Sequence, residues 1–163
     1  MKYTKILTDV IKYVNKKKKT SDEWNFAYYG SDIYFIYKKY AIYRIPSAVN
    51  PFRENYLKEN LRELNISWLM NFYSESNTLV INGTRQLSDK IECIIFTNNK
   101  GNEIVINETF LKYTDFGNNT IVKSIGKNTP VYFSECKDKV DYIICPIKVK
   151  EWKQWTTKQS KTQ

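Results

Sequence analysis

The spacing of apolar residues in the first third of the chain predicts one helix followed by three strands. Between residues 4 and 16, apolar side chains recur at helical intervals and polar ones occupy the opposite face, which is typical of an amphipathic helix. β-branched and aromatic residues then dominate three short runs, 24–29, 33–37 and 40–45, and we expect each to form a strand. Lys38 and Lys39 lie between the last two runs and are expected to form a tight turn. The expected apolar stripe of the helix consists of Ile6, Leu7, Val10, Ile11 and Val14.

The same order of elements returns in the last third of the chain. A short helix is expected over 107–115, preceded by a strand. The expected strands around it are 103–106, 120–125, 130–133 and 142–149. A β-α-β-β-β unit used twice predicts an α+β fold, a pseudo-symmetric domain with two helices lying on antiparallel sheets.

The middle of the chain predicts a long central connecting helix over 52–72, because Leu57, Leu61, Leu64 and Trp68 recur at helical spacing. Strands over 78–82 and 90–97 follow, and a hairpin turn is expected at 98–102.

No internal linker divides residues 1–149, so we expect a single domain there, followed by a polar tail over 150–163. Trp152 and Trp155 are the large apolar residues of this tail. They either pack back on the domain or form a partner-binding site.

Composition narrows the class of protein. The chain has 163 residues and is 42% hydrophobic, which is typical of a folded domain rather than a disordered one. No apolar run approaches the roughly 20 residues of a membrane helix, and no cleavage site follows the N-terminal apolar stretch. We therefore expect no membrane partner and a cytoplasmic location. Cys93 and Cys145 lie in apolar strand runs and are expected to be buried, unpaired thiols, whereas Cys136 has no such setting.

The chain contains no histidine, which removes the commonest general base and the commonest metal ligand. Asp89, Lys90 and Glu92 resemble a metal-dependent nuclease cluster only weakly, and a turn followed by a solvent-facing strand residue explains them better. The five glycines form no phosphate-binding loop. We therefore expect a protein that is not an enzyme, with no catalytic residues, no metal and no cofactor.

The net charge of +9 favours a polyanionic partner. Residues 1–19 contain seven lysines against Asp9. We expect non-specific contact with DNA phosphates there and at the turn between the second and third strands. An AT-rich genome offers a different explanation, because it would enrich lysine without any selection for binding. The predicted DNA-binding residues are Lys5, Lys12, Lys16, Lys17, Lys18, Lys19, Lys38 and Lys39.

Four tyrosines in the early strands, Tyr34, Tyr37, Tyr40 and Tyr43, have two interpretations. They form either a platform on which bases stack or part of an ordinary strand surface and core. We favour packing, because aromatic residues suit strands on packing grounds alone.

The second half resembles a domain of the bacterial DNA sliding clamp, the processivity subunit of the replicative polymerase. The residues that carry the resemblance are NETFL at 107–111, KNTPVYF at 127–133 and YIICPIKV at 142–149. The first half is similar more loosely, in DIYF at 32–35 and YAIYRIP at 40–46. The resemblance implies a DNA-clamp-like domain whose DNA-facing helices are 4–16 and 107–115. A clamp ring contains six such domains, and this chain has room for one. The resemblance therefore implies one of three arrangements: the chain forms a homo-oligomeric ring, it caps another ring, or it takes part in no ring.

Together these observations favour a clamp-like accessory protein of DNA metabolism, encoded by a phage or other mobile element. It would contact DNA phosphates non-specifically and dock a host or replication protein. The alternative is a phage or mobile-element protein that binds and inhibits a host enzyme or defence nuclease.

Overall fold

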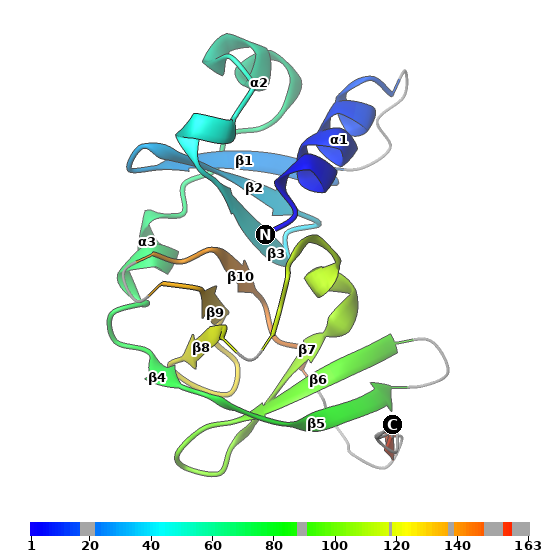
Figure 1. Cartoon of the computed structure of the whole chain (residues 1–163), viewed down its shortest axis with the longest axis vertical. Helices are drawn as coiled ribbons and strands as arrows, with labels where there is room; N and C mark the ends of the chain where they lie inside the picture. Colours follow the sequence, from blue (N-terminus) through cyan, green and yellow to red (C-terminus); the bar gives the residue numbers. More distant parts are fainter. Residues whose placement is uncertain (17–21, 88–90, 118, 137–138, 149–154, 158–163) are drawn as a thin grey trace.

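The computed structural model describes residues 1–16, 22–87, 91–117, 119–136, 139–148 and 155–157 (Figure 1). Its described helices are few and its strands many. The helical elements are α1 (Tyr3–Val14), η1 (Ser47–Val49), α2 (Glu54–Asn60), α3 (Ser67–Asn71) and η3 (Glu108–Tyr113). The strands are β1 (Trp24–Tyr29), β2 (Asp32–Tyr37), β3 (Ala41–Ile45), β4 (Asn77–Thr78), β5 (Val80–Leu87), β6 (Ile91–Thr97), β7 (Glu103–Asn107), β8 (Ile121–Ser124), β9 (Val131–Ser134), β10 (Tyr142–Ile144) and β11 (Trp155–Thr157).

The strands form two sheets, and every pair of neighbouring strands in them is antiparallel. The larger sheet has seven strands in the order β1-β2-β3-β10-β9-β8-β4, and the smaller has four in the order β11-β5-β6-β7. The predicted α+β class with antiparallel sheets is therefore confirmed.

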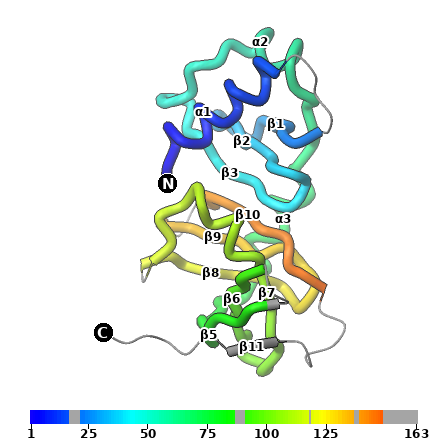
Figure 2. Tube along the Cα trace, turned by 90° about the vertical axis from the view of Figure 1, so that its right-hand side faces the viewer, coloured from blue at the N-terminus to red at the C-terminus, as the bar shows by residue number. Residues whose placement is uncertain are grey.

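Two units of one helix and three strands make up most of the larger sheet. Unit one is α1-β1-β2-β3 and unit two is η3-β8-β9-β10. The strands of unit one are ordered inward from one edge and those of unit two inward from the other side. They meet where β3 pairs with β10, with Ile42 opposite Ile143. Figure 2 shows β3, β10, β9 and β8 following one another through the molecule.

The expectation of two complete β-α-β-β-β units is wrong in one respect. Strand β7 precedes η3, but α1 begins at Tyr3 and no described strand precedes it. Moreover, β7 belongs to the smaller sheet. The repeat therefore consists of a helix and three strands.

The larger sheet is buried on both faces, because successive side chains of its strands point to opposite sides. Phe35 and Tyr43 face the cluster that contains α1, α2, η3 and the apolar residues of β6 and β7. Ile36 and Ile42 face a second cluster that contains α3 and Tyr132. The two helices of the units thus cover the same face, and α3 covers the other.

Helix α1 buries Ile6, Val10 and Tyr13 against the sheet. The sequence placed Ile11 in this stripe, but its side chain is 39% exposed and Tyr13 is buried in its place. The second predicted helix is a six-residue 3₁₀ helix. Asn107 begins it, and its side chain accepts a hydrogen bond from Thr109 N at 2.9 Å.

The predicted central helix over 52–72 is wrong, because two short helices replace it. Leu57 and Leu61 pack in the cluster under α1, whereas Leu64 packs in the cluster under α3. The chain between the helices runs along the edge of β1: Phe26 N donates to Arg62 O at 3.1 Å, and Leu64 N donates to Phe26 O at 2.8 Å. A continuous helix cannot place its apolar residues on both faces of one sheet, so it is interrupted at this edge.

The last predicted strand, 142–149, is also shorter than expected. Cys145 N donates to Tyr40 O and Ile147 N to Val105 O, each at 2.7 Å. After β10 the chain therefore crosses from the larger sheet to the smaller. In the predicted tail, Trp155 opens strand β11, which pairs with the C-terminal part of β5, and Trp152 lies outside the described residues.

All three cysteines are free. Cys93 is buried in β6, as predicted, and burial raises the pKa of its thiol to about 11. Cys145 was expected to be buried but is only partly so, because it follows the end of β10. Cys136 is exposed. Among the described helices, none has the length and apolar character needed to cross a membrane.

A candidate lysine-rich nucleic-acid interface

Lysines from three distant segments converge where α1, the β2–β3 turn and η3 meet. Lys5 Nζ of α1 donates a hydrogen bond of 3.4 Å to Lys112 O of η3. The ammonium group of Lys112 lies 4.5 Å from the ring centre of Tyr37, and that of Lys38 lies 5.2 Å from the same ring. We call this surface the lysine face, and it comprises Lys5, Lys12, Lys16, Lys38, Lys39 and Lys112.

Buried aromatic rings lie beneath the lysine face. Tyr37 and Tyr113 are 6% and 1% exposed, and Lys112 Nζ lies 4.5 Å from both ring centres. Trp24 packs against both rings, with centroid distances of 4.7 and 5.7 Å. Each contact of a cation with a ring contributes about 0.5–1 kcal/mol at an exposed site. The rings therefore support the ammonium groups and leave their charges at the surface.

Two acidic groups beside this surface are already engaged. Asp9 accepts a hydrogen bond of 2.7 Å from the Tyr113 hydroxyl, and Glu23 lies 3.7 Å from Lys16 Nζ. Burial, followed by this bond to Asp9, raises the pKa of Tyr113, so its hydroxyl remains a donor at neutral pH. Within the described residues, Lys5 and Lys38 form no ion pair with a carboxylate, so their charges are available to an anion.

The structure brings together most of the predicted DNA-binding residues. Lys5 and Lys12 are exposed on α1, and Lys16 is exposed just after it. Lys38 and Lys39 are exposed in the turn between β2 and β3, as predicted. The predicted residues Lys17, Lys18 and Lys19 lie outside the described residues.

Lys112 is the member that the sequence did not identify. Its neighbours in the chain include Glu108 and Asp115, so the local sequence does not indicate a basic helix. In the structure, Asp115 instead lies 2.7 Å from the amino group of Met1. Lys112 Nζ donates a hydrogen bond of 3.3 Å to the hydroxyl of Tyr37. The two residues are 75 positions apart in the chain. No local pattern in the sequence carries this information.

Other clusters in the described part of the chain offer no comparable chemistry. Arg44 donates to Asp32 and to Asp141 at 2.8 Å each, and all three side chains are 11–13% exposed. This cluster ties β2 and β3 to the start of β10 and leaves no free nucleophile. No group of three potential metal ligands occurs among the described residues. Of the weak nuclease cluster, Asp89 and Lys90 lie outside them, and Glu92 lies in β6 opposite Gln86.

A cavity of about 300 Å³ lies on the α3 side of the larger sheet. Tyr29 and Tyr34 of the first hairpin, Tyr73 after α3 and Lys139 before β10 contribute to its walls. Its carboxylate, Asp32, is bound to Arg44 and to Ser47 N. The carboxylate of the cavity is therefore already committed, and the lysine face remains the stronger candidate.

Comparison with known proteins gives no match: no family model, no curated protein and no solved structure matches this chain. The function is therefore argued from the geometry of the lysine face.

Proposed function

We propose that this chain is a non-catalytic accessory protein of DNA metabolism that binds the phosphate backbone through its lysine face. The observation that carries the proposal is the convergence of Lys5, Lys38 and Lys112 from three distant segments around two buried rings. A solvated helix end would require none of these contacts across the fold.

The chemistry of the lysine face favours phosphate over base edges. Lysine ammonium groups are point charges, and contacts with phosphate position a protein without reading sequence. The net charge of +9 adds a favourable long-range field. Binding is then independent of sequence, with dissociation constants of roughly micromolar to a hundred micromolar at physiological salt.

We propose further that the architecture is clamp-like. The support is the arrangement of the two units, which meet at the antiparallel β3–β10 pair and place α1 and η3 on one face of the larger sheet. The absence of a described strand before α1 and the short η3 are departures from the expected unit. A phage or mobile-element origin, and assembly of several copies into a ring, belong to this same proposal.

A second candidate function is binding and inhibition of a host enzyme or defence nuclease. The observation that favours it is an exposed aromatic pair at α3 and its C-terminal end: Trp68 is 58% exposed and Phe72, which follows the helix, is 40% exposed, with ring centres 6.4 Å apart. Exposed tryptophans often anchor protein interfaces. In that case the lysine face contributes solubility only.

The salt dependence of DNA binding tests the first proposal. Changing Lys5, Lys12 and Lys38 to glutamine should lower the slope of log affinity against log salt by about 2.7 on duplex DNA, because each lost phosphate contact removes about 0.9. The matched control changes the exposed residues Lys100, Lys127 and Lys148 to glutamine. It removes the same charge elsewhere and should leave the slope nearly unchanged.

Circular dichroism of each variant checks that the fold is retained. Equal slopes in the two triple variants would show that binding follows net charge and not the lysine face. No binding by the wild type at low ionic strength would contradict the proposal. Recovery of one host protein on the wild-type chain, lost in the Trp68→Ser variant, would then favour the second function.

A further inference from the structure

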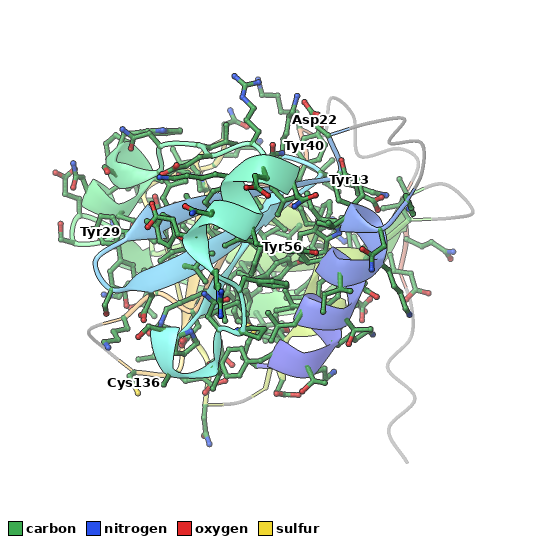
Figure 3. All side chains as sticks on the ribbon, turned by 90° about the horizontal axis from the view of Figure 1, so that it is seen from above. Tyr13, Asp22, Tyr29, Tyr40, Tyr56 and Cys136 are labelled. Atoms are coloured by element: carbon green, nitrogen blue, oxygen red, sulfur yellow. The ribbon has the colours of Figure 1, made fainter. Side chains whose placement is uncertain are left out.

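Of the four tyrosines in the early strands, one differs from the rest. Tyr34, Tyr37 and Tyr43 are 5%, 6% and 0% exposed, whereas Tyr40 is 59% exposed. Tyr34, Tyr37 and Tyr43 are thus buried in the core, whereas Tyr40 lies at the surface. In Figure 3, Tyr40 lies near the outline of the molecule, on the side where α1 ends.

The backbone of Tyr40 is fixed on both sides even though its ring is exposed. Its N–H donates to Tyr37 O at 3.1 Å, and its carbonyl accepts from Cys145 N at 2.7 Å. The ring of Phe110 in η3 lies 6.2 Å from the Tyr40 ring at an angle of 36°. The ring is thus held beside the lysine face with much of its surface open to solvent.

The turn that precedes Tyr40 has an unusual sequence for its conformation. Lys38 and Lys39 have φ values of 51° and 63°. Positive φ at both central residues is the mark of a type I′ turn, which strongly prefers Asn-Gly or Asp-Gly. A Cβ atom is unfavourable in this conformation because it lies close to the following carbonyl oxygen, and lysine has no short polar group that could compensate by bonding locally. The turn therefore places two lysine side chains at the surface in a backbone conformation that lysine does not favour.

We propose that Tyr40 stacks on an unpaired base of single-stranded DNA while the lysine face holds the flanking phosphates. This inference rests on the function proposed above and names its substrate class. An exposed ring next to lysines is the arrangement by which proteins bind single strands without reading sequence. Bases of an intact duplex are stacked on one another and offer no free face.

Other rings of the molecule do not compete for this role. Tyr37 and Tyr113, which lie beneath the lysines, are buried and have no face free for a base. Trp68 is as exposed as Tyr40, but it belongs to α3, which packs on the opposite face of the larger sheet. Trp68 therefore serves as a matched control.

Two oligonucleotides of equal length and charge test the proposal by fluorescence anisotropy: oligothymidylate, and the same backbone with abasic sites. The wild type should bind oligothymidylate about five- to one-hundred-fold more tightly, which is the range that one stacked base supplies. Tyr40→Leu should bind both oligonucleotides equally and at the wild-type abasic affinity. Trp68→Leu should keep the wild-type preference.

The failures of the two proposals are distinguishable. Equal binding of both oligonucleotides by the wild type would overturn base stacking and leave phosphate binding intact. A preference that survives in Tyr40→Leu, or disappears in Trp68→Leu, would also overturn the assignment to Tyr40. Binding of neither oligonucleotide at low ionic strength would overturn both proposals.

A turn variant supplies a second test. The double change Lys38→Asn and Lys39→Gly relieves the unfavourable backbone and removes two charges. Its Tm should rise by about 2–4 °C while its affinity for oligothymidylate falls. A variant with unchanged Tm and unchanged affinity would show that neither the strain nor the charge of this turn matters.

Discussion

Units one and two occupy equivalent positions in the larger sheet, yet their helices differ: α1 exposes charged side chains, whereas η3 is bound to the other unit. Helix α1 has twelve residues and exposes Lys5, Lys12 and Thr8 along its outer side. Helix η3 has six residues, and several hydrogen bonds hold it to unit one, two of them made by tyrosine hydroxyl donors. The Tyr43 hydroxyl donates to Phe110 O at 2.6 Å, and the Tyr113 hydroxyl donates to Asp9 at 2.7 Å. Unit one supplies most of the lysines of the lysine face, and unit two supplies Tyr113, one of the buried rings beneath those lysines.

The two units should nevertheless respond alike to alkali, because both bury tyrosines. Burial raises the pKa of Tyr34 in unit one and of Tyr132 in unit two to about 12, and it also raises those of Tyr43, Tyr113 and Tyr142. Above pH about 10 the unfolded chain loses these protons and the folded chain keeps them. Stability is therefore intact below pH 10 and falls by about 1.4 kcal/mol per tyrosine for each pH unit above it.

We expect cooperative unfolding within about one pH unit above 10, since typical domains are stable by only about 5–15 kcal/mol. Circular dichroism and tyrosinate absorbance should change together during the titration. The Tyr34→Phe variant, which removes one such group, should unfold at a higher pH. Early ionisation of several tyrosines in a chain that is still folded would show that the two units differ in their cores as well.

The joint between the two units should be sensitive to a single substitution. Changing Arg44 to Met leaves the mostly buried carboxylates of Asp32 and Asp141 without their cation and should lower the free energy of unfolding by about 3 kcal/mol. Urea denaturation measures this loss. Lys58→Met is the control, because its ion pair with Glu54 is exposed and should contribute little to stability. Equal losses in the two variants would mean that Arg44 does not join the units.

The two tyrosine hydroxyl donors among the hydrogen bonds between η3 and unit one allow a finer comparison. Tyr113→Phe removes a donor to the Asp9 carboxylate and should cost about 1.5–3 kcal/mol, whereas Tyr43→Phe removes a donor to a neutral carbonyl and should cost about 1 kcal/mol. The same urea titrations give both values. The reverse order would indicate that η3 is held mainly through Tyr43.

The sequence predicted the elements whose pattern is local. Helix α1 and strands β1 to β3 follow from apolar spacing, and the exposed lysines of α1 and of the turn follow from charge. The long central helix failed, because Leu57 and Leu64 have helical spacing but pack on opposite faces of the sheet. Periodicity records how far apart apolar residues are and not which face of a sheet receives them.

The candidate site was predictable only in part for the same reason. The lysines of α1 are close to one another in the chain, but the contact between Lys112 and Tyr37 joins residues that are 75 positions apart. Strand β11 was missed because its partner, the edge of β5, lies far from it in the chain. Likewise, nothing in the run of four tyrosines distinguishes Tyr40 until Phe110 and Cys145 are placed beside it.

The position of β10 has a consequence for how the protein folds during its synthesis. This strand lies at the centre of the larger sheet, between β3 and β9, although it follows every other strand of that sheet in the chain. Until residues 142–144 leave the ribosome, β3 and β9 are unpaired edges of the kind that promote association with other chains. The β3–β10 pairing also closes a loop of most of the chain length, which slows folding. We expect the first unit to remain incompletely ordered during translation and the sheet to form only after residues 142–144 have been synthesised.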